Sequence, residues 1–329
     1  MPAIALLVEP GSTPSSVALS LDIFRVADRF SADDPFSITL FSAAGGEVAL
    51  SPSLHLETVP LPARLKGFDA LILPGFFAAD MQELSRKLET QWRPAIARLA
   101  VLDDTPLVAA SCYGTFVLAE SGLLEGRAAT TTWWLREPFQ QRYPGVRLNA
   151  DRALVDDGRL ITAGAMTAHT DLSHHLLRRL KGHAVARQVG SIMLVDEGRG
   201  SQLPFVALQR RFGEPLTDAA IAWMERHLAE SGSARELAGV LHVSYRTLHR
   251  RFQGVTGMAP LAYLQALRVE CAKELLETSR MGVEQIAGAV GYADTTSFRR
   301  LFTRLTSETP ARYRRRFRRM EIEEATSDD

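Results

Sequence analysis

The chain has 329 residues, of which 38 are basic and 38 acidic, so its formal net charge is zero. This length suits two domains, each with its own core, and the balanced charge by itself says nothing about a nucleic-acid partner. No apolar stretch approaches the ~20 residues that a membrane helix needs, so we expect no membrane span. The two cysteines, Cys112 and Cys271, are too few for a disulfide framework and are typical of a reducing cytoplasm.

The first two hundred residues alternate apolar runs with amphipathic stretches. Residues 1–9 have no basic leader, and their apolar run is interrupted by Glu9 and Pro10, so they predict a strand rather than a signal peptide. Apolar runs predict buried strands over 4–8, 36–41, 70–73, 107–110 and 160–163. Amphipathic stretches predict helices over 17–30, 81–101, 113–121, 168–180 and 182–195. Such alternation predicts an α/β fold with helices on both faces of a doubly wound, mostly parallel sheet.

One strand–helix junction predicts a special site. In Pro106-Leu-Val-Ala-Ala-Ser-Cys112-Tyr-Gly114 a strand runs into Cys112 and a helix starts at once, with Gly114 relieving the crowding. This is the geometry of a nucleophile elbow, which displays a side chain above the strand ends. With Leu73-Pro-Gly75 and the segments 121–127 and 171–176, the junction resembles the PfpI-like, class I glutamine amidotransferase-like fold, a flavodoxin-like architecture, over about residues 1–195.

The resemblance implies catalysis only if the Cys112 thiolate is supported by a histidine and an acid. The chain has serines, Ser15 and Ser16, where the acid is expected, and Thr132 where the family commonly has histidine. Phe76 replaces the second glycine of the usual Pro-Gly-Gly turn. The sequence therefore predicts a non-catalytic elbow with no cofactor. Two alternatives stay open: Cys112 retains chemistry, or it only fits the turn.

Small molecules usually bind α/β folds at the carboxyl ends of the strands. A metal site is not expected there, because His169, His174 and His175 do not share a helix face. The position of the elbow instead predicts a metabolite pocket lined by Gly75, Phe76, Cys112, Tyr113, Trp133 and His169.

After a Gly- and Pro-containing linker predicted over 196–213, one pattern occurs twice, about fifty residues apart. The first copy, 233–252, offers Ser244 as N-cap of a helix with an apolar face, and the second, 282–302, offers Asp294 in the same role. This is the sequence form of a helix-turn-helix, which lays its second helix in the DNA major groove. The duplication argues against the alternative, a helical bundle with a solvated basic face. The outward faces carry the candidate DNA contacts Arg246, His249, Arg250, Thr295, Thr296, Arg299 and Arg300.

Residues 214–318 resemble the AraC-type DNA-binding domain, which has seven helices in two subdomains. The linking helix over 260–276 and the closing Thr309-Pro-Ala-Arg-Tyr-Arg314 match the family's central helix and terminal signature. Residues 240–320 contain fifteen Lys and Arg against six Asp and Glu, and we expect the arginine run 312–319 to contact phosphates. The domain is assigned to 214–320, and the acidic residues 321–329 are predicted to be a disordered tail.

As a whole, the chain resembles the GlxA-type regulators of the AraC family. The resemblance implies a cytoplasmic, sequence-specific transcriptional regulator, more often an activator, that binds double-stranded DNA. Its domain over 1–195 is then expected to sense a small-molecule effector and to form a homodimer, with RNA polymerase as a possible further partner and no membrane association. Two alternatives stay open: a bifunctional protein with chemistry at Cys112, or an N-terminal domain that only dimerises.

Overall fold

The computed structural model describes residues 1–102, 107–195, 200–208, 210, 212–230 and 234–317. The chain divides into two compact units, Met1–Gln202 and Leu203–Asp329, which we call unit 1 and unit 2 and describe separately. The tail predicted to be disordered, 321–329, lies outside the described residues, as do 196–199, 209 and 211 of the predicted linker. No helix in the described ranges is long and apolar enough to cross a membrane.

In its described part, unit 1 is built on an eight-stranded sheet with the strand order β3-β4-β2-β1-β5-β6-β10-β9. Every neighbouring pair from β4 to β10 is parallel, and only the edge strands β3 and β9 run antiparallel to their neighbours. The doubly wound, mostly parallel sheet predicted from the sequence is therefore confirmed. The strands of this sheet are β1 (Ala3–Leu7), β2 (Ser37–Ser42), β3 (Gly46–Ser51), β4 (Leu54–Pro60), β5 (Ala70–Leu73), β6 (Leu107–Ser111), β9 (Leu154–Asp157) and β10 (Leu160–Ala163).

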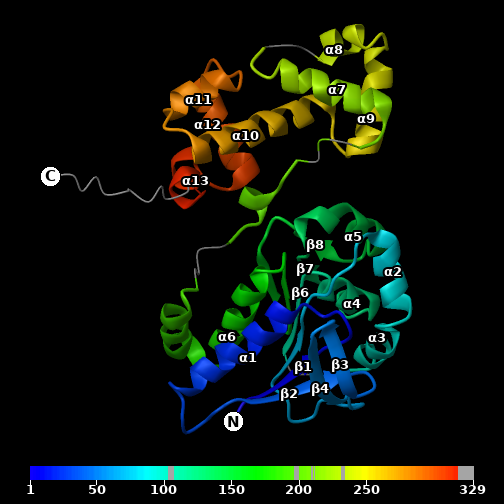
Figure 1. Ribbon diagram of the computed structural model, residues 1–329, viewed down its shortest axis with the longest axis vertical. Helices are drawn as coiled ribbons and strands as arrows, with labels where there is room; N and C mark the ends of the chain where they lie inside the picture. The colour runs from blue at the N-terminus through cyan, green and yellow to red at the C-terminus, as the bar shows by residue number, and fades with distance from the viewer. Residues whose placement is uncertain (103–106, 196–199, 209, 211, 231–233, 318–329) are drawn as a thin grey trace, which may run out of the picture. The chain divides into compact units, whose positions relative to one another are not determined.

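Helices cover both faces of the sheet (Figure 1). One face carries α1 (Pro14–Asp28) and α6 (Ala168–Met193), which pack on each other and on the apolar side of β1, β5 and β10. The helices of the other face are α2 (Met81–Glu89), α3 (Arg93–Leu99), α4 (Gly114–Glu120) and α5 (Arg136–Arg142). A two-stranded sheet of β7 (Ala128–Ala129) and β8 (Arg147–Leu148) completes the unit.

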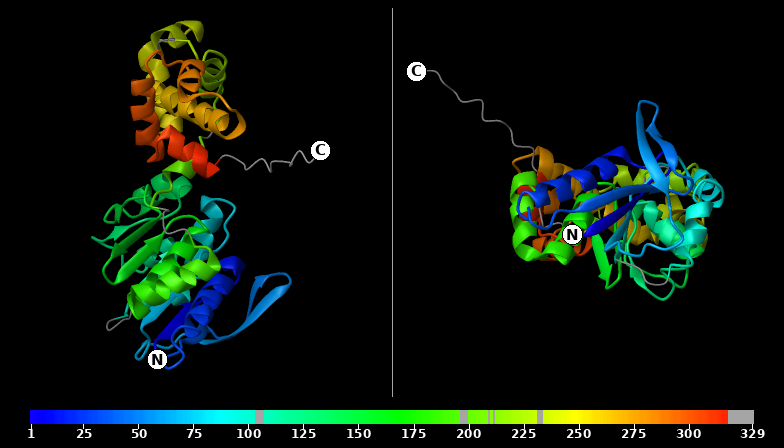
Figure 2. Two further views of the ribbon diagram at one scale, coloured as in Figure 1. Left: turned by 90° about the vertical axis from the view of Figure 1, so that its left-hand side faces the viewer. Right: turned by 90° about the horizontal axis from the view of Figure 1, so that it is seen from below.

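Several elements differ from the predicted ones, among them α5, β7, β8 and β9, which were not predicted. The helix expected over 81–101 is two helices, because Pro94, near the start of α3, has no backbone N–H to continue an existing helix. The β3–β4 hairpin was not predicted; it extends away from the rest of unit 1 (Figure 2), and most of its side chains are exposed or half-buried.

Unit 2 is all-helical in its described part. Its central helix α10 belongs to two cores: Tyr263 and Leu267 pack with the helices before it, and Ala272 and Leu276 pack with those after it. The helices are α7 (Pro215–Arg226), α8 (Ala234–Val240), α9 (Tyr245–Thr256), α10 (Pro260–Thr278), α11 (Val283–Ala289), α12 (Thr295–Thr306) and α13 (Pro310–Phe317).

The described residues of the predicted linker 196–213 make ordered contacts within the two units. Gln202 is buried in unit 1. In unit 2 the Phe205 ring lies 5.1 Å from the Phe317 ring, and Lys273 Nζ donates a hydrogen bond to the Val206 carbonyl at 2.8 Å. The chain therefore passes from one unit to the other between Gln202 and Leu203.

Candidate functional site

The two halves of unit 2 repeat one turn between helices. The Val243 N–H donates to the Ala238 carbonyl at 3.0 Å, and the Tyr292 N–H donates to the Ala287 carbonyl at 2.8 Å. In both copies the preceding residue has left-handed backbone, with φ of 54° at His242 and 85° at Gly291. Glycine is required only at the second turn, where a Cβ on Gly291 would lie 2.8 Å from the Leu228 carbonyl oxygen.

Each turn leads into a capped helix, α9 in the first copy and α12 in the second. Ser244 Oγ accepts the Thr247 N–H at 3.1 Å. Asp294 accepts the N–H groups of Thr296 and Ser297 at 3.0 and 2.9 Å. These bonds, with one from the Ser297 hydroxyl, lower the pKa of Asp294 to about 2, so this cap is ionised at neutral pH. Both helix starts are thus held by the residues predicted to cap them.

The buried faces of α9 and α12 repeat as well. Leu248 and Phe252 of α9 and Phe298 and Phe302 of α12 are fully buried. Because these anchors hold one face of each helix against the core, the opposite face is presented to solvent.

The repeat extends beyond the two helix-turn-helix motifs. Pro260 begins α10 and Pro310 begins α13, fifty residues later. Tyr263 packs edge-on against Phe252 at 5.2 Å, and Tyr313 packs edge-on against Phe302 at 5.5 Å. The shared spacing Pro-x-x-Tyr was visible in the sequence and could have shown that whole subdomains are duplicated.

The structure brings the candidate DNA contacts together on the outer faces of α9 and α12. Arg246, Arg250, Arg299 and Arg300 are exposed, as is Thr296, whereas His249 and Thr295 are half-buried. Under the fifty-residue shift Arg246 corresponds to Thr296, His249 to Arg299 and Arg250 to Arg300. The two helices therefore present polar groups at equivalent positions.

The four candidate arginines have no hydrogen bond or ion pair with any described residue, unlike several other arginines of unit 2. By contrast, Arg251 pairs with Glu214, and Arg268 donates to the Leu228 and Glu230 carbonyls at 2.9 and 2.7 Å. The first group is free to bind a ligand, and the second holds the fold together.

The distinction between paired and unpaired arginines also reduces the number of candidate phosphate contacts in the run 312–319. Arg314 donates to the Met281 carbonyl at 2.6 Å, and Arg316 pairs with the buried Glu308 at 2.6 Å. These two arginines are structural. Arg312 is exposed but lies 3.9 Å from the Glu308 carboxylate, whereas Arg315 is exposed with no ion pair to a described residue. Residues 318 and 319 lie outside the described ranges.

In unit 1, Cys112 sits between β6 and α4 with the left-handed backbone of an elbow, φ 55°. Its N–H donates to the Gly164 carbonyl at 2.9 Å, and Thr131 Oγ1 donates to the Cys112 carbonyl at 3.1 Å. Two glycines allow the tight packing, since a Cβ on Gly75 would lie 2.9 Å from Cys112 Cβ and one on Gly114 would lie 2.8 Å from the Pro74 carbonyl oxygen.

The surroundings of Cys112 are apolar and closed. The side chain is 6% exposed, and burial raises the pKa of its thiol to about 12. Phe76 is buried beside it, between Trp92 at 5.0 Å and Tyr113 at 5.6 Å. Among the described residues, no acidic or histidine side chain has a hydrogen bond to Cys112.

His169 lies beside Ser111, the residue before Cys112, but in the described part of the chain it has no hydrogen bond to Cys112 itself. Its ring is fully buried in the layer of α1 and α6, with Nε2 2.7 Å from Ser20 Oγ and Nδ1 2.8 Å from Ser111 Oγ. Because the Ser20 hydroxyl donates to the Ser16 carbonyl at 3.0 Å, His169 Nε2–H is the donor to Ser20, and Nδ1 accepts from Ser111. Burial lowers the pKa of His169 to about 4, so this histidine is a neutral structural link between α1, β6 and α6.

The other residues of the predicted pocket differ in how far they are exposed to solvent. Gly75, Phe76 and Cys112 are buried, whereas Tyr113 and Trp133 are half-buried. The Trp133 ring packs edge-on against Trp134, 44% exposed, at 5.4 Å. No group of three or more His, Cys, Asp or Glu side chains that could hold a metal ion occurs in the described ranges.

Iodoacetamide should alkylate Cys112 in the native protein about a thousandfold more slowly than in the urea-unfolded chain at pH 7.5. The thiolate is the reactive form, and a pKa of about 12 leaves far less of it than an unperturbed pKa near ~8.5. A Cys271→Ser variant makes Cys112 the only thiol, and mass spectrometry follows the adduct. Alkylation of the native protein at the unfolded-chain rate would instead support a reactive cysteine.

Two protein-family models match the chain. One describes the DJ-1/PfpI family and matches residues 20–179. The other describes a helix-turn-helix domain and matches residues 237–316. The two matches fall in unit 1 and unit 2 respectively.

Two relatives resemble this chain over nearly its whole length. The HTH-type transcriptional regulator CdhR of Pseudomonas aeruginosa is 28% identical over 311 residues, covering 94% of this chain and 90% of that protein. The HTH-type transcriptional regulator GlxA of Rhizobium meliloti is 27% identical over 307 residues, covering 92% of each. A solved structure from Vibrio parahaemolyticus, 16% identical with a TM-score of 0.50, covers 58% of this chain and 98% of that one, and shows the fold of unit 1 only.

Both family models, the order of the two units and the full-length relatives lead to one assignment. The chain belongs to the AraC family of DNA-binding transcriptional regulators, with an N-terminal DJ-1/PfpI domain and a C-terminal helix-turn-helix domain.

Proposed function

We propose that unit 2 reads a specific DNA sequence through α9 and α12, and that unit 1 is a non-catalytic sensor of a small metabolite. The observation that carries the DNA-reading part is the set of four unpaired arginines, Arg246, Arg250, Arg299 and Arg300, on two capped helices related by a fifty-residue repeat. Guanidinium groups that have no partner among the described residues are suited to bind guanine edges and phosphates.

The non-catalytic role of unit 1 is supported by the state of Cys112. Burial raises the pKa of its thiol to about 12, and Phe76 occupies the space beside the elbow. The full-length relatives are named as transcriptional regulators and not as enzymes. The competing proposal, a regulator that retains chemistry at Cys112, requires a thiolate that this environment disfavours.

Three further features belong to the proposal. Because its target is the chromosome, the protein acts in the cytoplasm. We expect activation rather than repression, as in the AraC-type family that residues 214–318 resemble, with RNA polymerase as partner. Unit 1 is expected to join two chains, so that two DNA-binding units gain affinity through effective concentration. Titration of the operator with the full-length chain should then saturate at two chains per operator.

Arg250→Ala and Arg300→Ala should each weaken binding to the selected operator by about 5- to 150-fold, equivalent to ~1–3 kcal/mol, and weaken binding to random DNA much less. The operator is first obtained by selection from random-sequence duplexes with the full-length chain, and fluorescence anisotropy gives the affinities. Arg251→Ala is the matched control on α9, because Arg251 already pairs with Glu214. Equal losses on operator and random DNA would reduce both arginines to phosphate contacts.

A further inference from the structure

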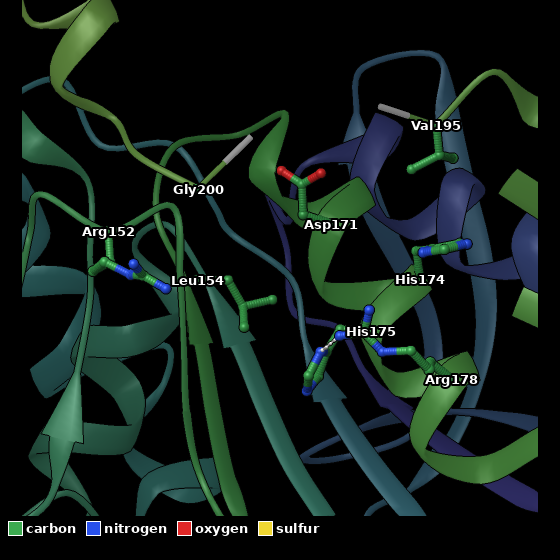
Figure 3. A pocket seen from close by; sticks show the side chains of 8 residues that line it. All are labelled: Arg152, Leu154, Asp171, His174, His175, Arg178, Val195 and Gly200. Atoms are coloured by element: carbon green, nitrogen blue, oxygen red, sulfur yellow. Dashed lines mark hydrogen bonds between the residues drawn. The ribbon is translucent and has the colours of Figure 1, made fainter. Parts of the chain in front are cut away.

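Unit 1 contains a cavity of about 210 Å³ between α6 and the edge strand β9, away from the elbow. Figure 3 shows two basic side chains directed toward it from opposite sides, Arg152 from the segment before β9 and Arg178 from α6. None of the residues predicted to form a pocket at the elbow lines this cavity. The described residues that line it are Arg152, Leu154, Asp171, His174, His175, Arg178, Val195 and Gly200.

The charge of Arg178 is not matched by a carboxylate. Arg178 Nη2 lies 2.6 Å from His175 Nδ1, and His175 Nε2 lies 2.7 Å from Asp156 Oδ2. A guanidinium only donates, so Nδ1 is an acceptor and His175 is a neutral ring that donates to Asp156 through Nε2. Burial lowers the pKa of His175, which favours this neutral form. Asp156 itself pairs with Arg179 at 2.7 Å, outside the cavity lining.

The guanidinium of Arg152 is free. It has no hydrogen bond or ion pair with any residue that the structure describes. The Arg152 carbonyl, by contrast, accepts hydrogen bonds from Thr130 and Gln202. Among the described residues of the lining, two guanidinium groups therefore face one carboxylate, that of Asp171. This excess of positive charge favours an anionic ligand.

The geometry of the guanidinium groups, the apolar lining and the volume of the cavity indicate which class of anion it binds. Guanidinium groups match the planar geometry of a carboxylate through paired N–H donors. Leu154 and Val195 provide apolar surface for a short aliphatic part. The volume is below the ~300–1,000 Å³ of sites for drug-sized ligands, which limits the ligand to a small metabolite.

The cavity adjoins the residues where the chain leaves unit 1. Val195 and Gly200 line it, and two residues later Gln202 ends the unit. The buried amide of Gln202 donates from Nε2 to the carbonyls of Thr131, Ala150 and Arg152 at 2.8, 2.9 and 3.0 Å. The Arg152 side chain thus faces the cavity, and the Arg152 carbonyl accepts a hydrogen bond from Gln202, the last residue of unit 1. We call the three hydrogen bonds from the Gln202 amide to these carbonyls the Gln202 clamp. A ligand that orders Arg152 therefore also acts on the Gln202 clamp.

We propose that this cavity binds the effector, that the effector is a small organic carboxylate held by Arg152 and Arg178, and that occupancy acts on DNA binding through the Gln202 clamp. The proposal rests on the proposed function, in which unit 1 senses a metabolite. It moves the sensing site from the elbow to the space between α6 and β9.

Sodium propionate is the probe, and thermal unfolding of the full-length chain is the readout. At about ten times its dissociation constant, propionate should raise the unfolding midpoint by about 3–6 °C, since only the folded site binds it. Propionamide, its neutral counterpart, and sodium chloride at equal ionic strength should not. Arg152→Gln and Arg178→Gln should abolish the rise, whereas the exposed Arg187→Gln on the same helix should keep it.

Arg178→Lys, which keeps the charge but loses the paired donors, should reduce the rise and so guards against a misfolded Arg178→Gln variant. The absence of a propionate-specific rise in the wild-type chain would overturn the site, and an equal rise with sodium phosphate would overturn the carboxylate assignment.

DNA binding provides the second readout and separates this proposal from the proposed function. Propionate should change operator affinity at least threefold in the wild-type chain and leave Arg178→Gln unchanged. If the chain binds its operator normally but propionate alters neither unfolding nor affinity, the cavity proposal is wrong and the regulator remains. If propionate binds without altering affinity, the site is not the effector site. If the full-length chain binds no selected duplex, the proposed function as a DNA-binding regulator is wrong.

Discussion

Raising the NaCl concentration from 50 to 200 mM should weaken DNA binding by the full-length chain about a thousandfold. Each phosphate that a protein neutralises releases condensed counterions, so the logarithm of affinity falls with the logarithm of salt by ~0.9 per phosphate. Because α9, α12 and the end of α13 present arginines that have no partner among the described residues, we expect about six phosphates to be neutralised and a slope of about −5.

Anisotropy titrations at five or more salt concentrations measure this slope. Arg315→Ala should make it shallower by about one, because Arg315 is exposed at the end of unit 2 and its loss removes one phosphate contact. Arg187→Ala, an exposed arginine of unit 1, should leave the slope unchanged. A slope near zero for the wild-type chain on every duplex would contradict the DNA interface.

The central sheet was predictable because its strands are buried on both faces. Strands such as β1 and β5 therefore appear in the sequence as uninterrupted apolar runs. The β3–β4 hairpin escaped prediction for the opposite reason: few of its side chains are buried, so it has no apolar run. Edge strand β9, with Asp156 and Asp157 among its four residues, was missed in the same way.

The frame of the DNA interface was predictable because caps and anchors are local. Ser244 and Asp294 cap helices that follow them directly, and each anchor pair is separated by one helical turn. Which arginines are unpaired was not predictable. Arg250 and Arg251 are neighbours, yet only Arg251 meets Glu214, which lies 37 positions earlier in the chain.

The elbow at Cys112 was predictable from the strand, the glycine and the helix that surround it in the sequence. The side chains that surround Cys112 in space were not predictable. The topology rule placed His169 near the elbow, and its Nδ1 does bond Ser111, the residue before Cys112, but its ring is fully buried and also bonds Ser20 of α1. The cavity between α6 and β9 has no local signal at all. Arg152 and Arg178 belong to different elements, and only the antiparallel edge strand brings them to one space.

Acidification from pH 6.5 to 4 should lower the free energy of unfolding of unit 1 by about 3 kcal/mol through His169 alone. The pKa of His169 is lowered from 6.5 to about 4 in the folded state by burial. Between these two values the unfolded chain binds a proton that the folded chain does not, so stability rises with pH there by up to ~1.4 kcal/mol per unit. The stabilisation is complete above pH 6.5 and is lost as pH falls toward 4.

Urea unfolding of the full-length chain at pH 7.0 and 4.5 measures this difference. A Trp223→Phe background confines the fluorescence signal to unit 1, whose tryptophans are Trp92, Trp133 and Trp134. His169→Gln keeps a donor and an acceptor for the two serines but does not titrate, so the wild-type chain should lose about 2.5 kcal/mol more than this variant between the two pH values. The exposed His55→Gln should retain the full wild-type loss. An equal loss in wild type and His169→Gln would show that His169 is protonated in the folded protein, and the neutral link between Ser111 and Ser20 would then be wrong.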